Sequence, residues 1–508
     1  MTKARIPLFA SADPETFPGD QLQGGVGLLN AVADRYPSGR LYITQRPAIN
    51  ILVDASDNTT KDKGRGVYYW GGTKDNYFVN DTGVYAGSYD NQIGTITTGK
   101  GSVFFVELPN NLFIFDYENG EGWVIDSSNN FTLISDQDFP SNIAGGGAAL
   151  NNTLYVFGAD GVINGSNVSD GESWSALNAI SAEREPDKGV YLAQVRDHIV
   201  AFGERTVEFF NDAGNPTASP LSRRQDISYR VGAVSSESVY ASGDIIHFIG
   251  EDRAGSLGLY RLSGFELKRI STPSIDNLIE TGIRTNGNIF IVSGGSIKGH
   301  DFIILTEADD SGTTYSVQRT IVVDITTGVW CPFKTSLLGH VHFPLTSWAI
   351  RSSTTNSSGI GMMSNGDVVK FDAGDGAEDR YVPTGFIDAD YIDDFYESAP
   401  TNQTAALSLV VRTEEFDADH QHKKFLDKLT LAGGVISGGS GVTDVSIRWT
   451  DDHYNTYSVA RNLSISTQAQ KMARCGQFVR RAWEVSYSGT DRLRLEFLEI
   501  DFRQSTYA

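Results

Sequence analysis

The stretch that decides the fold is Thr153-Leu-Tyr-Val-Phe-Gly158, which returns 45 residues later as His198-Ile-Val-Ala-Phe-Gly203. Each copy contains four or five apolar residues and stops at a glycine. A run of this length that ends at a turn residue is typical of a buried strand and is too short for a helix. Similar runs, with a glycine or an aspartate as the stop, end at Gly71, Asp116, Gly250 and Gly294.

The spacing of these runs predicts a repeat architecture. Successive stop residues are 42 to 47 residues apart, and a seventh copy stops at Ser364 after a longer insertion. A period of about 40–50 residues with several strands per unit is the pattern of a β-propeller, whose blades bury their faces by packing in a ring. We therefore predict an all-β chain with a propeller of seven blades, or six, over residues 56–380. A large β-sandwich with accidentally regular spacing is the competing interpretation.

The remaining parts of the chain differ from the repeat. Residues 381–508 contain longer strands with alternating apolar and polar residues, such as Arg492–Phe502. Alternation of this kind indicates strands that are half buried. We predict an antiparallel β-sandwich domain over residues 381–508, and an N-terminal arm with the first strands over residues 1–55.

Composition narrows the classes of function. The chain of 508 residues is 40% hydrophobic and has 41 Lys and Arg against 63 Asp and Glu, a net charge of −22. The hydrophobic fraction excludes a disordered chain, and the acidity argues against wrapping of nucleic acid, which needs Lys and Arg to neutralise phosphates. No apolar run is long enough for a membrane-spanning helix. The first residues lack a signal-peptide core, so we expect no ordinary secretion.

Motifs that carry chemistry are incomplete in this sequence. The segment Gly94–Gly101 has the glycine and lysine spacing of a P-loop, but Gly101 replaces the Ser or Thr that would hold magnesium, and we interpret it as a turn. His420 and His422 are spaced as a ligand pair, but adjacent lysines would oppose a cation. Acidic turns such as 372–376 and 307–312 lack the calcium-loop pattern. We predict no catalytic, cofactor-binding or metal site.

Four basic residues cluster near the C-terminal end: Lys471, Arg474, Arg480 and Arg481. Only uncharged residues interrupt them. Residues 381–508 carry a net charge of −5, so most of the acidity lies in the rest of the chain. We predict that the cluster is a subunit interface that contacts an acidic neighbouring subunit. The alternative interpretation is a solvated strand edge that is protected by charge.

Several segments resemble one protein family, the packaged-DNA stabilisation proteins of short-tailed bacteriophages. The strand pair in Val200–Asn215, the segment Tyr229–Val234 and the stretch Ile270–Ile279 are similar to the middle of these proteins. The segment Gln45–Ile49 is similar to an early motif, although Ala48 replaces its glycine. Gly476–Arg481 and the final strand are similar to the ending.

The resemblance implies a structural virion protein of the phage tail that is not an enzyme. Such proteins form a hexameric hub, or nozzle, below the portal and the head–tail adaptor, and carry tail fibres, tailspikes or a needle. They help to retain packaged double-stranded DNA, which later passes through the channel of the ring without sequence-specific binding. Assembly in the host cytoplasm is expected, and an acidic channel would keep contacts with phosphates few. The alternative is a carbohydrate-binding or polysaccharide-cleaving propeller, such as a receptor-binding tail component.

Overall fold

The computed structural model describes residues 2–8, 27–53, 63–182, 185, 187–215, 217–311, 315–335, 342–350, 359–371, 378–381, 403–418, 421–437, 443–465 and 471–505. Almost all regular structure in these ranges is β-strand, which confirms the all-β prediction. The helical part of the described chain is α1 (Pro273–Glu280), continued by the π-helical turn η2 (Thr281–Thr285). In the same ranges no helix has the length and apolar character that crossing a membrane requires.

Three antiparallel sheets follow one another in the first part of the repeat region, and we number the sheets in chain order. Each is built from consecutive strands joined by short turns. Sheet 1 contains β6 (Gly64–Trp70), β7 (Asp75–Asn80), β8 (Gly83–Ala86) and β9 (Gln92–Thr95). Sheet 2 contains β10 (Phe104–Leu108), β11 (Asn111–Asp116), β12 (Glu121–Asp126) and β13 (Phe131–Leu133). Sheet 3 contains β15 (Ala148–Leu150), β16 (Thr153–Phe157), β17 (Val162–Asn167) and β18 (Asp170–Ser181).

Three further sheets continue the series to residue 332. Sheet 4 contains β14 (Gly145–Gly146), β19 (Gly189–Val195), β20 (His198–Gly203), β21 (Val207–Asp212) and β22 (Leu221–Tyr229). Sheet 5 contains β23 (Val231–Ala233), β24 (Val239–Ser242), β25 (Ile245–Asp252), β26 (Leu257–Ser263) and β27 (Glu266–Arg269). Sheet 6 contains β28 (Ile289–Ile297), β29 (His300–Asp309), β30 (Ser316–Asp324) and β31 (Val329–Pro332). Helix α1 lies between sheets 5 and 6 in the chain.

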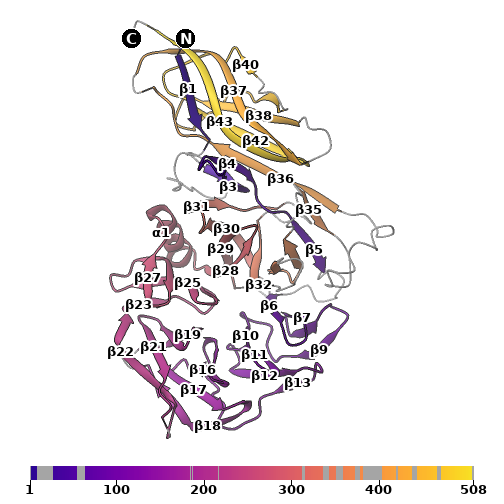
Figure 1. Cartoon of the computed structure of the whole chain (residues 1–508), viewed down its shortest axis with the longest axis vertical. Coiled ribbons are helices and arrows are strands. Elements are labelled where there is room, and N and C mark those ends of the chain that lie inside the picture. Colours follow the sequence, from indigo (N-terminus) through magenta and orange to yellow (C-terminus); the bar gives the residue numbers. More distant parts are fainter. Residues whose placement is uncertain are drawn as a thin grey trace.

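A segment from near the N-terminus completes the last sheet of the series. Sheet 7 contains β32 (Leu345–Ile350), β33 (Gly359–Met363) and β34 (Val368–Phe371), and β5 (Ile49–Val53) pairs antiparallel with β34. Sheet 7 also contacts sheet 1. The Thr346 hydroxyl donates to the Gly64 carbonyl at 3.2 Å, and the Val67 amide donates to the Ser347 hydroxyl at 3.2 Å. The last sheet therefore packs beside the first (Figure 1).

Hydrophobic clusters between successive sheets hold the ring together. Val79 and Leu112 belong to a cluster of sheets 1 and 2, and Phe202 and Phe248 to a cluster of sheets 4 and 5. Phe78 of sheet 1 lies in a cluster with residues of sheet 7. This packing explains the continuous apolar runs of the sequence, because a strand with neighbours on both faces needs apolar residues at every position. The predicted propeller is confirmed as a fold class, and the seven sheets support its seven blades, a number that stays a prediction.

The C-terminal part is an antiparallel β-sandwich that also takes in N-terminal strands. Its first sheet has the order β3 (Ala31–Arg35), β4 (Leu41–Gln45), β43 (Arg492–Gln504), β37 (Lys424–Ser437) and β40 (Lys471–Ala473), with β1 (Thr2–Pro7) on β43 and β41 (Gln477–Phe478) on β37. Its second sheet has the order β36 (Gln403–Arg412), β42 (Ala482–Gly489), β38 (Thr443–Thr450) and β39 (Arg461–Ile465), with β2 (Gly27–Leu29) on β36. The sandwich lies at one end of the molecule and the ring at the other (Figure 1).

The strand β5 also connects the two parts. Besides β34 it pairs in parallel with β35 (Glu378–Tyr381), which in turn pairs with β36 of the sandwich. Sheet 7 and the second sandwich sheet are therefore one continuous hydrogen-bonded sheet. The domain boundaries at residues 55 and 380 stay a prediction; β1, β3 and β4, from the predicted arm, pair within the sandwich.

The final strand β43 follows its expected alternation only in its first half. Leu493 and Leu495 are buried, but beyond them the buried positions are Leu498, Ile500 and Phe502. The register with β37 shifts between Ala432 and Gly433, opposite this change. The shift moves Phe497 to the outer side, where the guanidinium of Arg5 lies 4.7 Å from its ring centroid.

Candidate functional site

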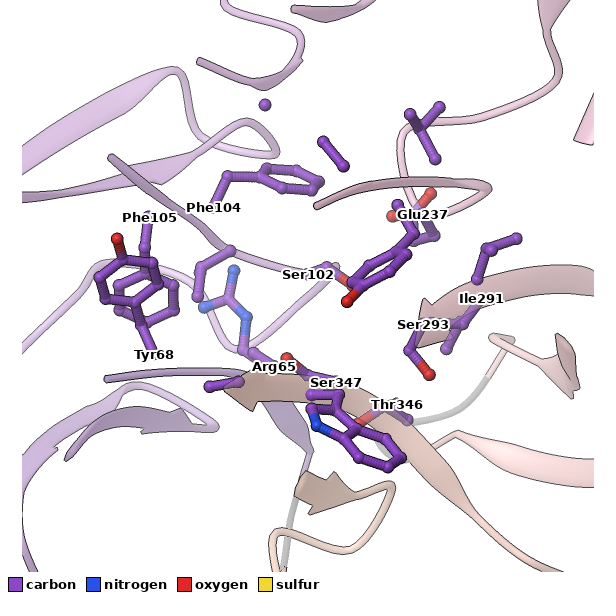
Figure 2. Close-up of a pocket in the computed structure, with 18 of the residues that line it drawn as sticks. Arg65, Tyr68, Ser102, Phe104, Phe105, Glu237, Ile291, Ser293, Thr346 and Ser347 are labelled. Carbon is purple, nitrogen blue, oxygen red and sulfur yellow. The ribbon is translucent and has the colours of Figure 1, made fainter. Parts of the chain in front are cut away.

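The innermost strands of the sheets surround a cavity of about 360 Å³ on the axis of the ring (Figure 2). Its walls come from β6, β10, β19, β24, β28 and β32, with Gly146 of β14 and Gly147 after it. A volume of this size suits a small molecule. It is far too small for a DNA duplex.

A buried ion pair stands beside this cavity. A guanidinium nitrogen of Arg65 on β6 lies 3.0 Å from a carboxylate oxygen of Asp116 on β11, and both side chains are fully buried. Burial raises the pKa of Asp116, while the charge of Arg65 opposes this rise. Arg65 also donates to the carbonyl of Gly101 at 2.8 Å and to that of Thr98. The P-loop-like segment therefore binds an arginine through its carbonyl oxygens, as a turn between sheets 1 and 2.

Two contacts cross the axis at one face of the ring. Tyr117 of sheet 2 donates a hydrogen bond to Glu237, which precedes β24 of sheet 5. Tyr315, which precedes β30 of sheet 6, lies 3.4 Å from the Ser102 hydroxyl (oxygen to oxygen) before β10. These sheets are not neighbours in the ring, so the contacts close the axis at this face.

The same face is reinforced by Lys63. Its ammonium group forms an ion pair with Asp310 and lies 3.9 Å from the ring centroid of Tyr315. Lys63 is buried and immediately precedes β6 of sheet 1, while Asp310 follows β29 of sheet 6. Of the residues of this face, sequence reasoning singled out Asp310 alone, as part of the acidic turn 307–312, and it missed the ion pair with Lys63. Their partners are separated by up to 247 residues, and no local pattern marks them.

The predicted basic interface separates into exposed and internal residues. Lys471 on β40 and Arg474 after it are exposed, and Arg480 is partly exposed with one nitrogen 3.3 Å from Glu415. Arg481, in contrast, has a side chain that is only 2% exposed. The structure thus brings Lys471 and Arg474 to the surface of the sandwich and turns Arg481 into its interior.

All three guanidinium nitrogens of Arg481 donate hydrogen bonds inside the sandwich. Two nitrogens donate to the carboxylate of Asp451, each at 2.7 Å, and further hydrogen bonds reach the carbonyls of Cys475 and Gln477. The guanidinium carbon lies 4.7 Å from the ring centroid of Phe478. Arg481 therefore fastens the segment 475–478 to the end of β38.

A second arginine cluster lies on the outer face of the sandwich. Glu484 on β42 accepts hydrogen bonds from Arg412 at 2.7 Å and from Arg448 at 2.6 and 3.0 Å. Burial opposes ionisation of Glu484, but the hydrogen bonds from Arg448 and Arg412 outweigh it and lower the pKa of Glu484. The ionised form is thus more stable in the folded chain than in the unfolded chain.

We expect this cluster to make stability depend on pH in the acidic range. The pKa of Glu484 is depressed on folding, so its contribution is present above the unfolded value of about 4.3 and is lost as pH falls towards the folded value. Urea unfolding of the wild type and of Glu484→Gln between pH 7 and pH 3 measures the difference. The gap between the two should narrow as pH falls. A gap that is constant with pH would contradict the assignment.

Some of the other motifs considered as ligand sites lie outside the described residues. These are His420 and the turn 372–376. In the turn 307–312, Glu307 is buried in an ion pair with Arg319 at 2.6 Å. Asp309 accepts a hydrogen bond from the amide of Ser311. Within the described ranges no group of three or more His, Cys, Asp or Glu could hold a metal ion.

The fold and the axial face define the class of this molecule, a β-propeller protein with a β-sandwich at one end. Over residues 29–348, more than half of the chain, the sequence matches the family described as "Bacteriophage P22 Gp10, beta-propeller". The chain belongs to this family. Membership confirms the resemblance seen in the sequence and gives the protein a structural, DNA-stabilising role in a phage, with a location in the virion.

Comparisons with solved structures give weaker likenesses. The extracellular domain of a hybrid two-component system from B. thetaiotaomicron aligns at 7% identity with a TM-score of 0.42, over 64% of this chain and 40% of the other. An inactive variant of virginiamycin B lyase from Staphylococcus aureus aligns at 8% identity with a TM-score of 0.40, over 61% and 96%. The N-terminal domain of Nup159 aligns at 8% with a TM-score of 0.37, over 68% and 98%. The chain spans less than half of the first of these proteins.

These scores are all below 0.5 and carry no argument about function. The search of curated protein sequences found no match. The family match is therefore the comparison on which the role of the protein rests.

Proposed function

We propose that this protein forms a hexameric ring in the phage tail, a nozzle or hub below the head–tail adaptor, which retains packaged DNA and conducts it during ejection. The observation that carries the proposal is the family match over residues 29–348. The closed axis of the propeller supports it, because DNA would have to pass through a channel between subunits. The partners would be other copies of the chain, a portal-proximal adaptor, and tail fibres, tailspikes or a needle.

The proposed ring needs two different complementary faces on each subunit, since a head-to-tail ring is built from heterologous contacts. The exposed residues Lys471 and Arg474 of the sandwich supply a basic face. The rest of the chain carries most of the net charge of −22 and supplies the acidic one. Arg480 lies at the margin of the basic face, and Arg481 acts inside the sandwich.

Native mass spectrometry of the purified protein, with imaging of particles that carry it, tests the proposal. A six-fold ring with an open channel on its axis, below a portal, is the expected result. Such a ring should keep the packaged DNA inside the particle. A trimer that binds or cleaves host polysaccharide would overturn the proposal in favour of a receptor-binding or polysaccharide-cleaving protein.

Charge reversal at the exposed basic residues should weaken ring assembly without unfolding the chain. We expect the double variant Lys471→Glu and Arg474→Glu to shift the native mass spectrum from rings to monomers. Because both side chains are exposed, its free energy of unfolding should stay within about 0.5 kcal/mol per residue of the wild type. The matched control reverses two exposed charges of the propeller, Arg253→Glu and Lys268→Glu. Equal ring formation by the test variant and the wild type would show that this face is not the interface.

A further inference from the structure

The axial cavity contains a buried carboxylate without a cationic partner. Glu237 lines the cavity and is 8% exposed. Its carboxylate accepts hydrogen bonds from the hydroxyls of Tyr117 and Ser236, the latter at 3.2 Å. Among the ion pairs of the described residues, none includes Glu237. Burial of a charge is costly unless an opposite charge or a metal accompanies it.

The other charged group of the cavity wall cannot balance Glu237. Arg65 is already paired with Asp116 at 3.0 Å, and its other recorded hydrogen bonds go to main-chain carbonyls. The negative charge of Glu237 also acts on two nearby tyrosines, Tyr117 and Tyr315. Burial first, and then Glu237, raise the pKa of both Tyr117 and Tyr315. The cavity is therefore electrostatically suited to a cation.

Aromatic rings line the same cavity as this carboxylate. The Phe104 ring lies 6.0 Å (centroid to centroid) from that of Tyr117, which donates to Glu237, and 5.3 Å from that of Tyr191. Figure 2 shows Phe104, Glu237 and Ser102 around the same space. Aromatic faces attract ammonium groups through the ring quadrupole, and cages of this kind recognise organic cations.

The size and the ligand set separate an organic cation from a metal ion. A volume of about 360 Å³ is much larger than a bare metal ion needs. The described residues offer no group of three His, Cys, Asp or Glu around a metal. We propose that the axial cavity binds a small aliphatic amine, whose ammonium group pairs with Glu237 against the aromatic wall and whose alkyl part lies against Ile291 of β28 and Trp348 of β32.

Isothermal titration calorimetry with 1,4-diaminobutane tests the proposal. The wild type should bind with one site per chain, and Glu237→Gln, which keeps the shape but removes the charge, should bind at least tenfold more weakly. The exposed control Glu266→Gln should bind as the wild type does. If Glu237→Gln does not fold, Phe104→Leu serves as the second variant, because it removes one aromatic face and should weaken binding without a change of charge.

Three results would overturn the proposal. The first is no heat of binding to the wild type up to millimolar amine. The second is equal affinity of the wild type and Glu237→Gln, which would put the amine elsewhere on this acidic chain. The third is binding of MgCl₂ that depends on Glu237 together with no binding of the amine, which would make the cavity a metal site. None of these results affects the proposed hexamer, which native mass spectrometry tests separately.

Discussion

Replacing Arg65 by methionine should cost about 3–5 kcal/mol of folding free energy, the range measured when one partner of a buried ion pair is removed. Methionine preserves much of the side-chain volume but leaves Asp116 buried without its counter-charge. The carbonyls of Thr98 and Gly101 also lose their donor. Urea unfolding followed by tryptophan fluorescence measures the loss.

The control for Arg65→Met is an arginine in an exposed ion pair. Arg196 lies 2.8 Å from Asp244, and both side chains are at least half exposed. Exposed pairs contribute about 0–1 kcal/mol, so Arg196→Met should lie near the wild type. The double variant Arg65→Met and Asp116→Leu should recover part of the loss, because it removes the unpaired charge. A loss of unfolding free energy below about 1 kcal/mol for Arg65→Met would show that the ion pair does not stabilise the propeller.

The second large effect is a loss of stability between pH 6.5 and pH 4 that depends on His247. This residue of β25 is buried, and neither of its ring nitrogens has a hydrogen-bond partner in the structure. Tyr240 of β24 and Arg261 of β26 flank it in register. Burial, and then the positive charge of Arg261, lower the pKa of His247 to about 4.

The sign follows from proton binding in the two states. Below the ordinary histidine pKa of about 6.5, His247 is protonated in the unfolded chain. In the folded chain it stays neutral until the pH falls to about 4. Stability is therefore complete above pH 6.5 and falls across this window by about 3 kcal/mol. The variant His247→Leu, which cannot titrate, should lose this dependence. The pH profile of the wild type minus that of His247→Leu isolates the effect, because carboxylates contribute equally to both.

The control is His300, a histidine whose pKa is shifted in the opposite direction. Asp324 accepts a hydrogen bond from His300 and raises the pKa of that imidazole, so its contribution is present at low pH and is lost as pH rises through the folded value. His300→Leu should therefore change the profile in the opposite direction. If the profiles of the wild type and His247→Leu run parallel from pH 7 to pH 4, the imidazole is not held neutral in the fold.

The sequence could predict those features that repeat locally. The runs around Leu154 and Ile199 mark β16 and β20, which are buried on both faces and so need apolar residues throughout. The alternating pattern marked β43, until a register shift reversed its faces beyond Leu495. Such a shift depends on the partner strand β37, so the pattern of one strand could not reveal it.

The sites were harder to predict because they depend on distant pairs. Tyr117 and Glu237 are 120 residues apart, and Arg65 and Asp116 are 51 apart. Arg480 and Arg481 show the same difficulty. Val479 and Arg480 lie in a bend, where the alternation of an extended strand does not apply, and Arg481 is buried through its distant partner Asp451.

The pairing of β5 with β34 has a consequence for synthesis in the cell. Residues 49–53 leave the ribosome more than 300 residues before their partner strand at 368–371, which takes roughly 15–65 s at ordinary elongation rates. During that time an apolar strand has no permanent edge on which to pair. Long-range pairing of this kind slows folding and exposes nascent chains to aggregation. The propeller can therefore close only after residue 371 has been made, and chaperone demand should peak for chains truncated between residues 53 and 368.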